Sequence, residues 1–217
     1  MRILLVEDNL ELAGQIAMAL NDLGFTLEQA HDGDTGLAFG LSEDFDAVVL
    51  DLGLPDIQGG EILKRWRKAG RAMPVLILTA RGSWMDKVDG LNAGADDFVV
   101  KPAHAQEIAA RLRALIRRSA GKSTPILVHG EIELCPASGT VTVSGNPVEL
   151  TGQEFRILNY FMHRPGRILS QSELLDHIYQ LESERGPNTI EVYVSRLRRK
   201  LGRDAIKTMR GLGYRFG

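Results

Sequence analysis

Charged and hydroxyl side chains follow four apolar runs in the first half of the chain, each where a run ends. They are Glu7 and Asp8 after 3–6, Asp51 after 47–50, Thr79 after 75–78, and Lys101 after 98–100. If the runs are parallel strands, these residues meet at one edge of the sheet, beyond the carboxyl ends where ligands bind. Clustered carboxylates repel one another unless a cation neutralises them, and Mg²⁺ suits a few carboxylates with waters and a phosphate. We therefore expect one of the aspartates at this edge to attack a phosphoryl group, with Lys101 meeting its oxygens and the Thr79 hydroxyl bonding to it.

Two other interpretations of these residues stay open. Any one of them alone is typical of a polar strand terminus, although four at corresponding positions favour a site. A dinucleotide-binding domain would need a glycine-rich turn after the first strand, where this chain has Glu7-Asp8-Asn9 instead.

Strand and helix patterns alternate through this first half. The expected strands are Ile3–Val6, Thr26–Ala30, Ala47–Leu50, Val75–Leu78 and Phe98–Val100. Apolar stripes at helical spacing lie between them, at Leu12, Ile16, Leu20 and Leu23, at Ile62, Leu63 and Trp66, and at Ile108, Leu112 and Leu115. Gly24, Gly70 and Gly94 stand where helices should end. The alternation predicts a parallel sheet covered on both faces over residues 1–118.

The pattern changes after a small, polar linker at 119–125. Short strands are expected at 126–128, 132–134, 140–143 and 148–150, with turn residues such as Gly145-Asn146-Pro147 between them. Helices are expected near 151–163, 171–180 and 187–201, the first opened by a capping box of Thr151 and Glu154. The end of this second domain, residues 206–216, predicts a hairpin.

The helix near 187–201 has an apolar stripe and a basic, mixed-polar exterior. Ile190, Val194, Leu197 and Leu201 form the stripe, and the exterior holds Asn188, Thr189, Glu191, Val192, Tyr193, Ser195, Arg196, Arg198, Arg199 and Lys200. Such a helix fits the DNA major groove, where arginine reads guanine and Val192 could touch a thymine methyl group. We expect Arg198, Arg199 and Lys200 to meet phosphates or solvent. An ordinary charged surface helix would have the same pattern.

Composition is that of a globular protein whose two halves differ in charge. The net charge is −2, with −5 over residues 1–118 and +3 over 119–217. This asymmetry indicates different partners for the halves, or merely two solvated surfaces of unlike sign. No apolar run approaches the roughly 20 residues that span a bilayer. The first apolar run ends at Glu7-Asp8 and is too short for the apolar region of a signal peptide. With the single Cys135, we expect a cytoplasmic protein that makes no membrane contact.

The first half resembles the receiver domain of two-component systems, and the whole chain resembles the OmpR/PhoB family. The matching residues are Glu7-Asp8, Asp51-Leu52-Gly53-Leu54-Pro55, Thr79-Ala80, Gly94-Ala95-Asp96-Asp97 and Lys101-Pro102. The resemblance implies an α/β, flavodoxin-like five-stranded parallel receiver domain followed by a winged helix-turn-helix DNA-binding domain.

For the acidic site, the resemblance implies that Asp51 accepts a phosphoryl group from a sensor histidine kinase. It also implies that Glu7, Asp8, Asp51 and the Gly53 carbonyl surround Mg²⁺, and that the Lys101-Pro102 peptide is cis. The chain departs from the family at Phe98, where tyrosine is usual, and at Ala103, where phenylalanine is usual. Phe98 has no hydroxyl group, so we expect coupling between Thr79 and the dimerisation face to be weaker or to rest on packing.

The resemblance also implies homodimerisation on phosphorylation, through one charged face of the receiver. Its expected residues are Lys87, Leu91, Asp96, Asp97, Glu107, Ala109, Arg111 and Arg118. Lys87 would pair with Glu107, Asp97 with Arg111, and Asp96 with Arg118. Without the family, a solvated face with an internal Glu107–Arg111 pair explains the same charges.

In the second half, the ending Arg210-Gly211-Leu212-Gly213-Tyr214 resembles the family's C-terminal hairpin, whose arginine reaches the minor groove or backbone of DNA. The loop 181–186 corresponds to the family's contact surface for RNA polymerase. We therefore expect a phosphorylation-controlled transcription regulator that binds tandem half-sites on double-stranded DNA, and not an enzyme. The alternatives are a phosphatase with an aspartate nucleophile, for which neither a general acid nor a substrate cap is found, and a DNA-binding protein without the phosphate switch.

Overall fold

The computed structural model describes residues 1–80, 90–121, 124–177 and 189–217. The chain divides into two compact units, Arg2–Ser119 and Ala120–Gly217. The division falls where the last helix of the first unit ends, one residue into the segment predicted as a linker.

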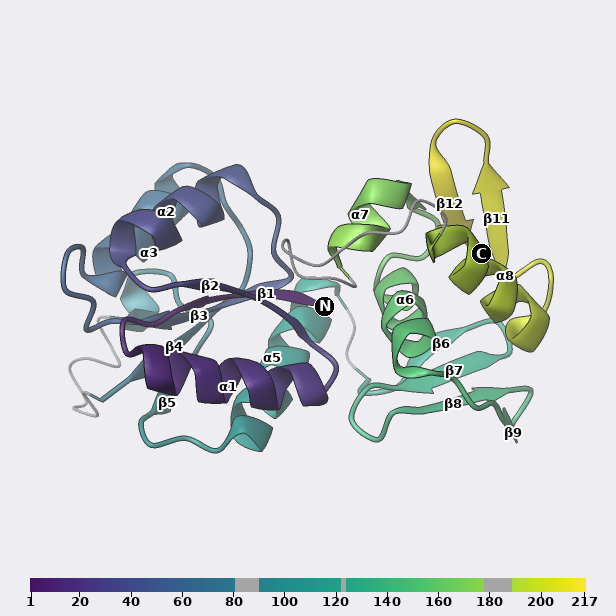
Figure 1. The fold of residues 1–217 in the computed structure, drawn as a ribbon, viewed down its shortest axis with the longest axis horizontal. Helices are drawn as coiled ribbons and strands as arrows, with labels where there is room; N and C mark the ends of the chain where they lie inside the picture. Colours follow the sequence, from purple (N-terminus) through teal and green to yellow (C-terminus); the bar gives the residue numbers. More distant parts are fainter. Residues whose placement is uncertain (81–89, 122–123, 178–188) are drawn as a thin grey trace. The chain divides into compact units, whose positions relative to one another are not determined.

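The first unit is a five-stranded parallel sheet with helices on both faces. Its strands are β1 (Arg2–Val6), β2 (Thr26–Ala30), β3 (Ala47–Asp51), β4 (Val75–Thr79) and β5 (Asp97–Val100), in the order β2-β1-β3-β4-β5. Its helices are α1 (Leu10–Asp22), α2 (Gly33–Ser42), α3 (Gly59–Lys68) and α5 (Ala105–Ser119). In Figure 1, α2 and α3 lie above the sheet and α1 and α5 below it. This arrangement confirms the predicted flavodoxin-like fold.

The sheet is buried because its central strands face helices on both sides. All residues of β1, β3 and β4 are buried, as expected for continuous apolar runs in a parallel sheet. The predicted stripes of α3 and α5 are buried in full. On α1, alanines share the buried face with Ile16 and Leu20, while Leu12 is only half-buried.

Helix α2 packs closely because glycines occupy its buried face, a feature that no apolar stripe could predict. Gly33, Gly36 and Gly40 are its buried residues. A Cβ atom at Gly40 would lie 2.3 Å from the indole of Trp66, and one at Gly36 would lie 2.7 Å from Val6. The indole N–H of Trp66 donates to the Leu37 carbonyl at 3.1 Å. The α2–α3 contact therefore requires residues without side chains on α2.

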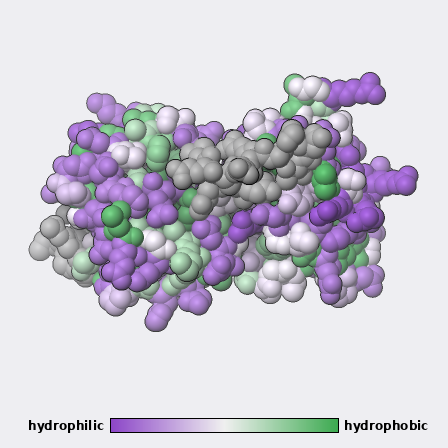
Figure 2. Space-filling model, viewed as in Figure 1, coloured by the Kyte–Doolittle hydropathy of each residue, from purple (hydrophilic) through white to green (hydrophobic). Residues whose placement is uncertain are grey.

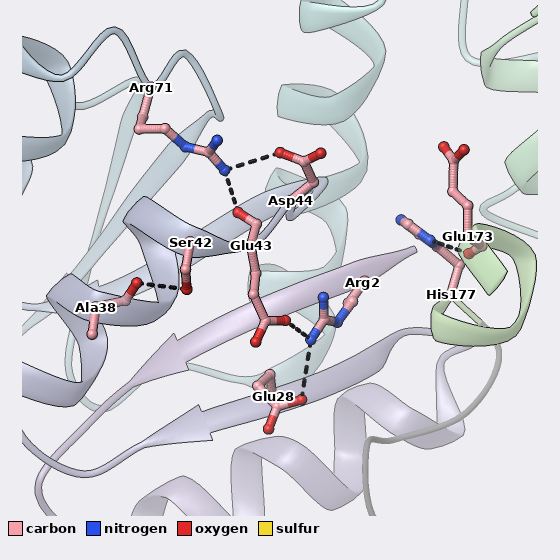
Figure 3. A network of polar contacts seen from close by, with 9 residues as sticks. All are labelled: Arg2, Glu28, Ala38, Ser42, Glu43, Asp44, Arg71, Glu173 and His177. Carbon is pink, nitrogen blue, oxygen red and sulfur yellow. Dashed lines mark hydrogen bonds and ion pairs between the residues drawn. The ribbon is translucent and has the colours of Figure 1, made fainter. Parts of the chain in front are cut away.

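Ion pairs hold the amino-terminal edge of the sheet, away from the strand ends that carry the acidic residues. Arg2 pairs with Glu43 and, at 3.4 Å, with Glu28 on β2 (Figure 3). Arg71 donates to the Glu43 carbonyl and lies 3.0 Å from the Asp44 carboxylate. These contacts fix the loop between α2 and β3.

Over its described residues, the second unit combines a small antiparallel sheet, helices and a C-terminal hairpin (Figure 1). The sheet consists of β6 (Leu127–His129), β7 (Ile132–Cys135), β8 (Thr140–Val143) and β9 (Asn146–Pro147). The helices are α6 (Gly152–His163), α7 (Gln171–Asp176) and α8 (Thr189–Leu201). The strands β10 (Ile168–Leu169), β12 (Gly213–Phe216) and β11 (Ile206–Met209) pair in that order. The predicted winged helix-turn-helix architecture is confirmed.

Two details of this unit differ from the prediction. The strand expected at 148–150 lies at Asn146–Pro147, because Ser144 (φ 51°) and Gly145 (φ 77°) form a two-residue turn that aligns Val143 with Asn146. Positive φ at both turn residues matches the twist of antiparallel strands. The sequence also gave no sign of β10, a two-residue strand whose Ile168 and Leu169 pair with β12.

Hydrophilic side chains dominate the visible face of both units, and only small hydrophobic areas interrupt them (Figure 2). In the described parts of the chain, no helix has both the length and the apolar composition that a membrane span requires.

The glycine face of α2 yields a stability prediction. We expect Gly40→Ala to lower the free energy of unfolding by about 1–3 kcal/mol, because overpacking against Trp66 outweighs the helix-propensity gain of roughly 1 kcal/mol. Gly14→Ala on α1 is the matched control: nothing lies within 4 Å of the new Cβ atom, so it should be neutral or stabilising. Urea unfolding measures both, and a Gly40→Ala protein at least as stable as wild type would contradict the packing account.

Candidate functional site

The polar strand termini of the receiver lie at one edge of the sheet, as predicted. Asp51 and Thr79 are the last residues of the adjacent strands β3 and β4, and Lys101 follows β5. Glu7 and Asp8 follow β1, on the other side of β3. Carboxylate oxygens of Glu7, Asp8 and Asp51 all lie within 4.8 Å of one another. The parallel topology thus brings Asp51 close to Glu7 and Asp8, which lie far from it in the sequence.

The ammonium group of Lys101 lies among these acids. Its Nζ is 2.7 Å from Asp51 Oδ2 and 2.6 Å from Glu7 Oε2. Glu7, Asp51 and Thr79 are buried, whereas Asp8 is exposed. The Lys101-Pro102 peptide is cis, as the resemblance implied.

Burial and charge shift the pKa values of this cluster. Burial raises the pKa of Glu7 above its ordinary value and the Asp51 charge adds to the rise, while Lys101 offsets only part of it. Burial alone would lower the pKa of Lys101, but its contacts with Asp51 and Glu7 outweigh burial and raise that pKa. The lysine is therefore charged at neutral pH and stabilises the two acids beside it.

The donor set fits a hard divalent cation. Three carboxylates and one ammonium group leave a formal charge of −2. Within the described part of the chain, no hydrogen bond reaches the buried Oε1 of Glu7. The Gly53 amide donates to Asp51 Oδ1 at 3.0 Å, so this residue borders the cluster. Mg²⁺ prefers oxygen ligands, and its charge of +2 would balance the formal charge of −2.

Two residues that sequence reasoning missed fix the chain that follows Asp51. A Cβ atom at Gly59 would lie 2.2 Å from the Asp51 carbonyl oxygen, so α3 can begin there only on glycine. Asp56, in the loop after Asp51, accepts the amides of Gly33 and Asp34 at 2.8 Å each. These bonds lower the pKa of Asp56 and join the loop to the first turn of α2.

Helix α8 matches the predicted recognition helix. Ile190, Val194, Leu197 and Leu201 are buried, which confirms the apolar stripe. The exposed residues on its other faces are Glu191, Val192, Ser195, Arg196 and Arg199, while Tyr193 is half-buried. Arg210 is exposed in the turn between β11 and β12.

Two basic residues of α8 make hydrogen bonds to other elements of the fold. Arg198 Nε donates to the Ile206 carbonyl at 2.7 Å and Nη2 to Thr208 at 2.8 Å, so this side chain supports β11. Lys200 Nζ lies 2.7 Å from the buried Glu154 carboxylate and 2.8 Å from the Glu149 carbonyl. Both side chains therefore bond to other elements, and the expectation that they meet phosphates or solvent stays a prediction.

The capping box at α6 is confirmed and extends into this contact. The Thr151 hydroxyl accepts the Glu154 amide at 3.3 Å, and Glu154 Oε2 accepts the Thr151 amide at 2.8 Å. Burial would raise the pKa of Glu154, but the bonds from Lys200 and Thr151 outweigh burial and lower that pKa. One carboxylate therefore caps α6 and binds the last turn of α8.

On the expected dimerisation face, charges are paired within the chain. Arg111 lies 2.9 Å from Asp97 and 2.9 Å from Glu107, so the internal pair considered as an alternative is present. Leu91 and Arg118 are exposed. Ala109 is fully buried beneath the face, because α5 turns this side inward with Ile108 and Leu112; its part in a dimer interface stays a prediction. Phe98, half-buried on β5, aligns with Ile77.

Some predicted residues lie outside the described part of the chain: Lys87, Asn188, the end of the helix expected at 171–180, and the loop 181–186. The side chain of Thr189 is likewise not described.

Comparison with protein families gives one match for each unit. Residues 3–113 match the response regulator receiver domain, and residues 145–216 match the C-terminal domain of transcriptional regulatory proteins.

Similar proteins resemble the chain over its whole length. It is 44% identical to the response regulator protein PmrA of Pseudomonas aeruginosa, over 99% of this chain and 97% of that protein. It is 42% identical to the transcriptional regulatory protein QseB of Escherichia coli O157:H7, over 100% and 99%.

Solved structures show the same similarity. DrrB of Thermotoga maritima, described as an OmpR/PhoB homologue, covers 99% of this chain and 98% of its own, at 27% identity and a TM-score of 0.50. The receiver domain of the sensor histidine kinase PA1611 of P. aeruginosa, solved with magnesium in its active-site cleft, covers 53% of this chain and 96% of its own, at 31% identity and a TM-score of 0.50.

The Glu154–Lys200 contact yields the second prediction. We expect Lys200→Met to lower the free energy of unfolding by about 1–3 kcal/mol at pH 7, because it leaves a buried carboxylate without its cation; the partial exposure of Lys200 reduces the effect. Arg199→Met, one residue away and exposed, should change stability little.

The pH dependence follows from the lowered pKa of Glu154. Its stabilisation is present above the unfolded pKa of about 4.3 and is lost as pH falls through the lower folded value. The stability gap between wild type and Lys200→Met should therefore close in that range. Thermal melts from pH 7 to 3 measure this gap, and one that does not change with pH would show that the carboxylate is not involved.

Proposed function

The chain belongs to the OmpR/PhoB family of two-component response regulators, and from that premise we propose that Mg²⁺-dependent phosphorylation of Asp51 controls its binding to DNA. A sensor histidine kinase donates the phosphoryl group. The observation that carries the proposal is the cluster of Glu7, Asp8 and Asp51 with Lys101 between two of these acids. Nothing in the family suggests turnover of an external substrate.

In the proposed reaction, an oxygen of Asp51 forms a P–O bond as the P–N bond to the kinase histidine breaks, and the leaving imidazole takes a proton from solvent. A bound Mg²⁺ supplies charge neutralisation between the carboxylates and the phosphoryl oxygens. Glu7, Asp8, Asp51 and the Gly53 carbonyl are the groups that would hold it. Because Asp51 is the last residue of a central strand, its carboxylate is held at the open edge where the kinase histidine can reach it.

Lys101 has a part in both states of this site. Before phosphorylation it pairs with Asp51 and Glu7. Afterwards it is in reach of a phosphoryl oxygen on Asp51, and so remains paired as the aspartate gains charge. The hydroxyl of Thr79, on the adjacent strand, donates a second contact to the phosphoryl group. Because Phe98 has no hydroxyl group to bond, the coupling from Thr79 through β5 to the dimerisation face rests on packing.

We further propose that phosphorylation promotes a homodimer through Leu91, Asp96, Asp97, Glu107, Arg111 and Arg118, with Lys87 paired to Glu107. Exposed pairs are worth about 0–1 kcal/mol each, which suits a dimer that must dissociate when the phosphate is lost. Dimerisation places two DNA-binding domains on tandem half-sites, so the second domain binds at a high effective concentration. RNA polymerase is the proposed partner of the loop 181–186.

The third prediction tests the phosphoacceptor. With Mg²⁺ and acetyl phosphate, wild type should incorporate one acid-stable, base-labile phosphoryl group, and Asp51→Ala should incorporate none. Asp44→Asn, whose side chain is 92% exposed, is the control and should label as wild type does. Intact-protein mass spectrometry measures the incorporation. Equal labelling of wild type and Asp51→Ala would refute the assignment.

The fourth prediction separates base readout from phosphate contact on α8. On an operator selected from random duplexes, Arg196→Ala should lose about 1–3 kcal/mol of specific binding and discriminate less between sequences. Arg199→Ala should weaken all duplexes alike and reduce the salt slope by about one. Lys64→Ala, which removes the same charge from an exposed site in the receiver, should bind normally. Fluorescence anisotropy at several salt concentrations measures these affinities; unchanged binding by both α8 variants would show that this helix does not contact DNA.

A further inference from the structure

Arg67, on α3, uses its whole guanidinium group to hold two segments, the loop that leads into β5 and the chain between α3 and β4. Nε and Nη2 donate to the Gly94 carbonyl at 3.1 and 2.9 Å. Nη1 donates to the carbonyls of Arg71 and Met73, each at 2.9 Å. Nη2 also reaches Asp96 Oδ2 at 3.1 Å. These bonds match the five N–H donors that an arginine has.

Gly94 is shaped to receive this guanidinium. Its φ is +103°, and a Cβ atom there would lie 3.1 Å from Arg67 Cγ and 3.2 Å from Arg67 Nε. Any larger residue would therefore combine backbone strain with a close contact. The backbone conformation of Gly94 and its lack of a side chain together make room for the Arg67 guanidinium.

The same arrangement fixes the Asp96 carboxylate while leaving one of its oxygens available. Oδ2 accepts the Val75 amide at 2.8 Å as well as Arg67, and the Asp96 amide donates to the Val75 carbonyl at 2.9 Å. Among the described residues, no hydrogen bond uses Oδ1, and the side chain is 42% exposed. A carboxylate accepts bonds on both oxygens, so Asp96 can take a further donor without releasing Arg67.

We infer that Arg67 is a positioning residue for association of two copies of this chain, holding Asp96 ready for the partner copy's Arg118; the inference rests on the proposed dimerisation. An exposed ion pair is weak largely because two flexible side chains must be ordered to form it. Arg67 orders one of them in advance. Arg118 itself is exposed and makes no ion pair with the described residues.

The test compares dimer dissociation constants by sedimentation, with Mg²⁺ and beryllofluoride as the phosphoryl mimic. We expect Arg67→Gln to raise the constant about tenfold, since a two-fold dimer contains the pair twice and tenfold corresponds to about 1.4 kcal/mol. The control is Arg65→Gln on the same helix, where an exposed arginine has Glu61 at 2.9 Å as its ion-pair partner among the described residues; it should dimerise as wild type does.

A double-mutant cycle separates positioning from a general structural effect. If Arg67 acts through Asp96 and Arg118, then Arg67→Gln should change the dimer constant less than about threefold in an Arg118→Gln background. Equal effects in both backgrounds would overturn the inference, because a general loosening of the fold adds to the loss of Arg118.

Hydrogen exchange on the monomer, without beryllofluoride, keeps the inference separate from the proposed function. Amides 94–97 should exchange faster in Arg67→Gln than in wild type or Arg65→Gln. Unchanged exchange overturns the positioning role whatever the oligomeric state. Faster exchange together with unaltered dimerisation overturns the link to the partner. A wild type that stays monomeric with beryllofluoride refutes the proposed dimerisation itself, and this inference with it.

Discussion

The repulsion between carboxylates at the edge of the parallel sheet is the constraint on which the rest of the receiver depends. Glu7, Asp8 and Asp51 come within 4.8 Å of one another, and two of them are buried. Lys101 compensates for part of this charge, which leaves a deficit that a divalent cation or a cationic partner must fill. In the proposed reaction, Mg²⁺ would fill this deficit and so permit Asp51 to gain the further negative charge of a phosphoryl group.

The short strand β5 connects this site to the charged face beyond it. Lys101 follows its last residue, while Asp97, its first residue, pairs with Arg111 on α5. Arg67 holds the loop just before the strand. A change in what Lys101 contacts therefore acts on an element only four residues long, both ends of which are fixed by ion pairs or hydrogen bonds. In the DNA-binding unit, Arg198 and Lys200 similarly fix α8 to neighbouring elements.

The sequence predicted the elements whose signals are local. Apolar runs predicted the five receiver strands, the Thr151–Glu154 spacing predicted a capping box, and the polar strand termini predicted the acidic site. The rest depends on contacts between distant residues. The close approach of Gly40 to Trp66 and of Gly59 to Asp51 could not be predicted, because the sequence shows only that these positions are glycine. In the sequence, Lys200 looks the same as the exposed basic residues beside it on α8. Its contact with Glu154, on α6, therefore could not be predicted. The buried position of Ala109 likewise depends on which side of α5 faces the sheet.

A crystal structure of the full chain with Mg²⁺ and beryllofluoride tests the central claim most directly. The account predicts one Mg²⁺ held by oxygens of Glu7, Asp8 and Asp51 and by the Gly53 carbonyl. Beryllofluoride should be attached to Asp51, with Lys101 Nζ and the Thr79 hydroxyl within hydrogen-bond distance of its fluorines. Mg²⁺ bound elsewhere, or beryllofluoride absent from Asp51 while Lys101 keeps both of its present partners, would contradict the account.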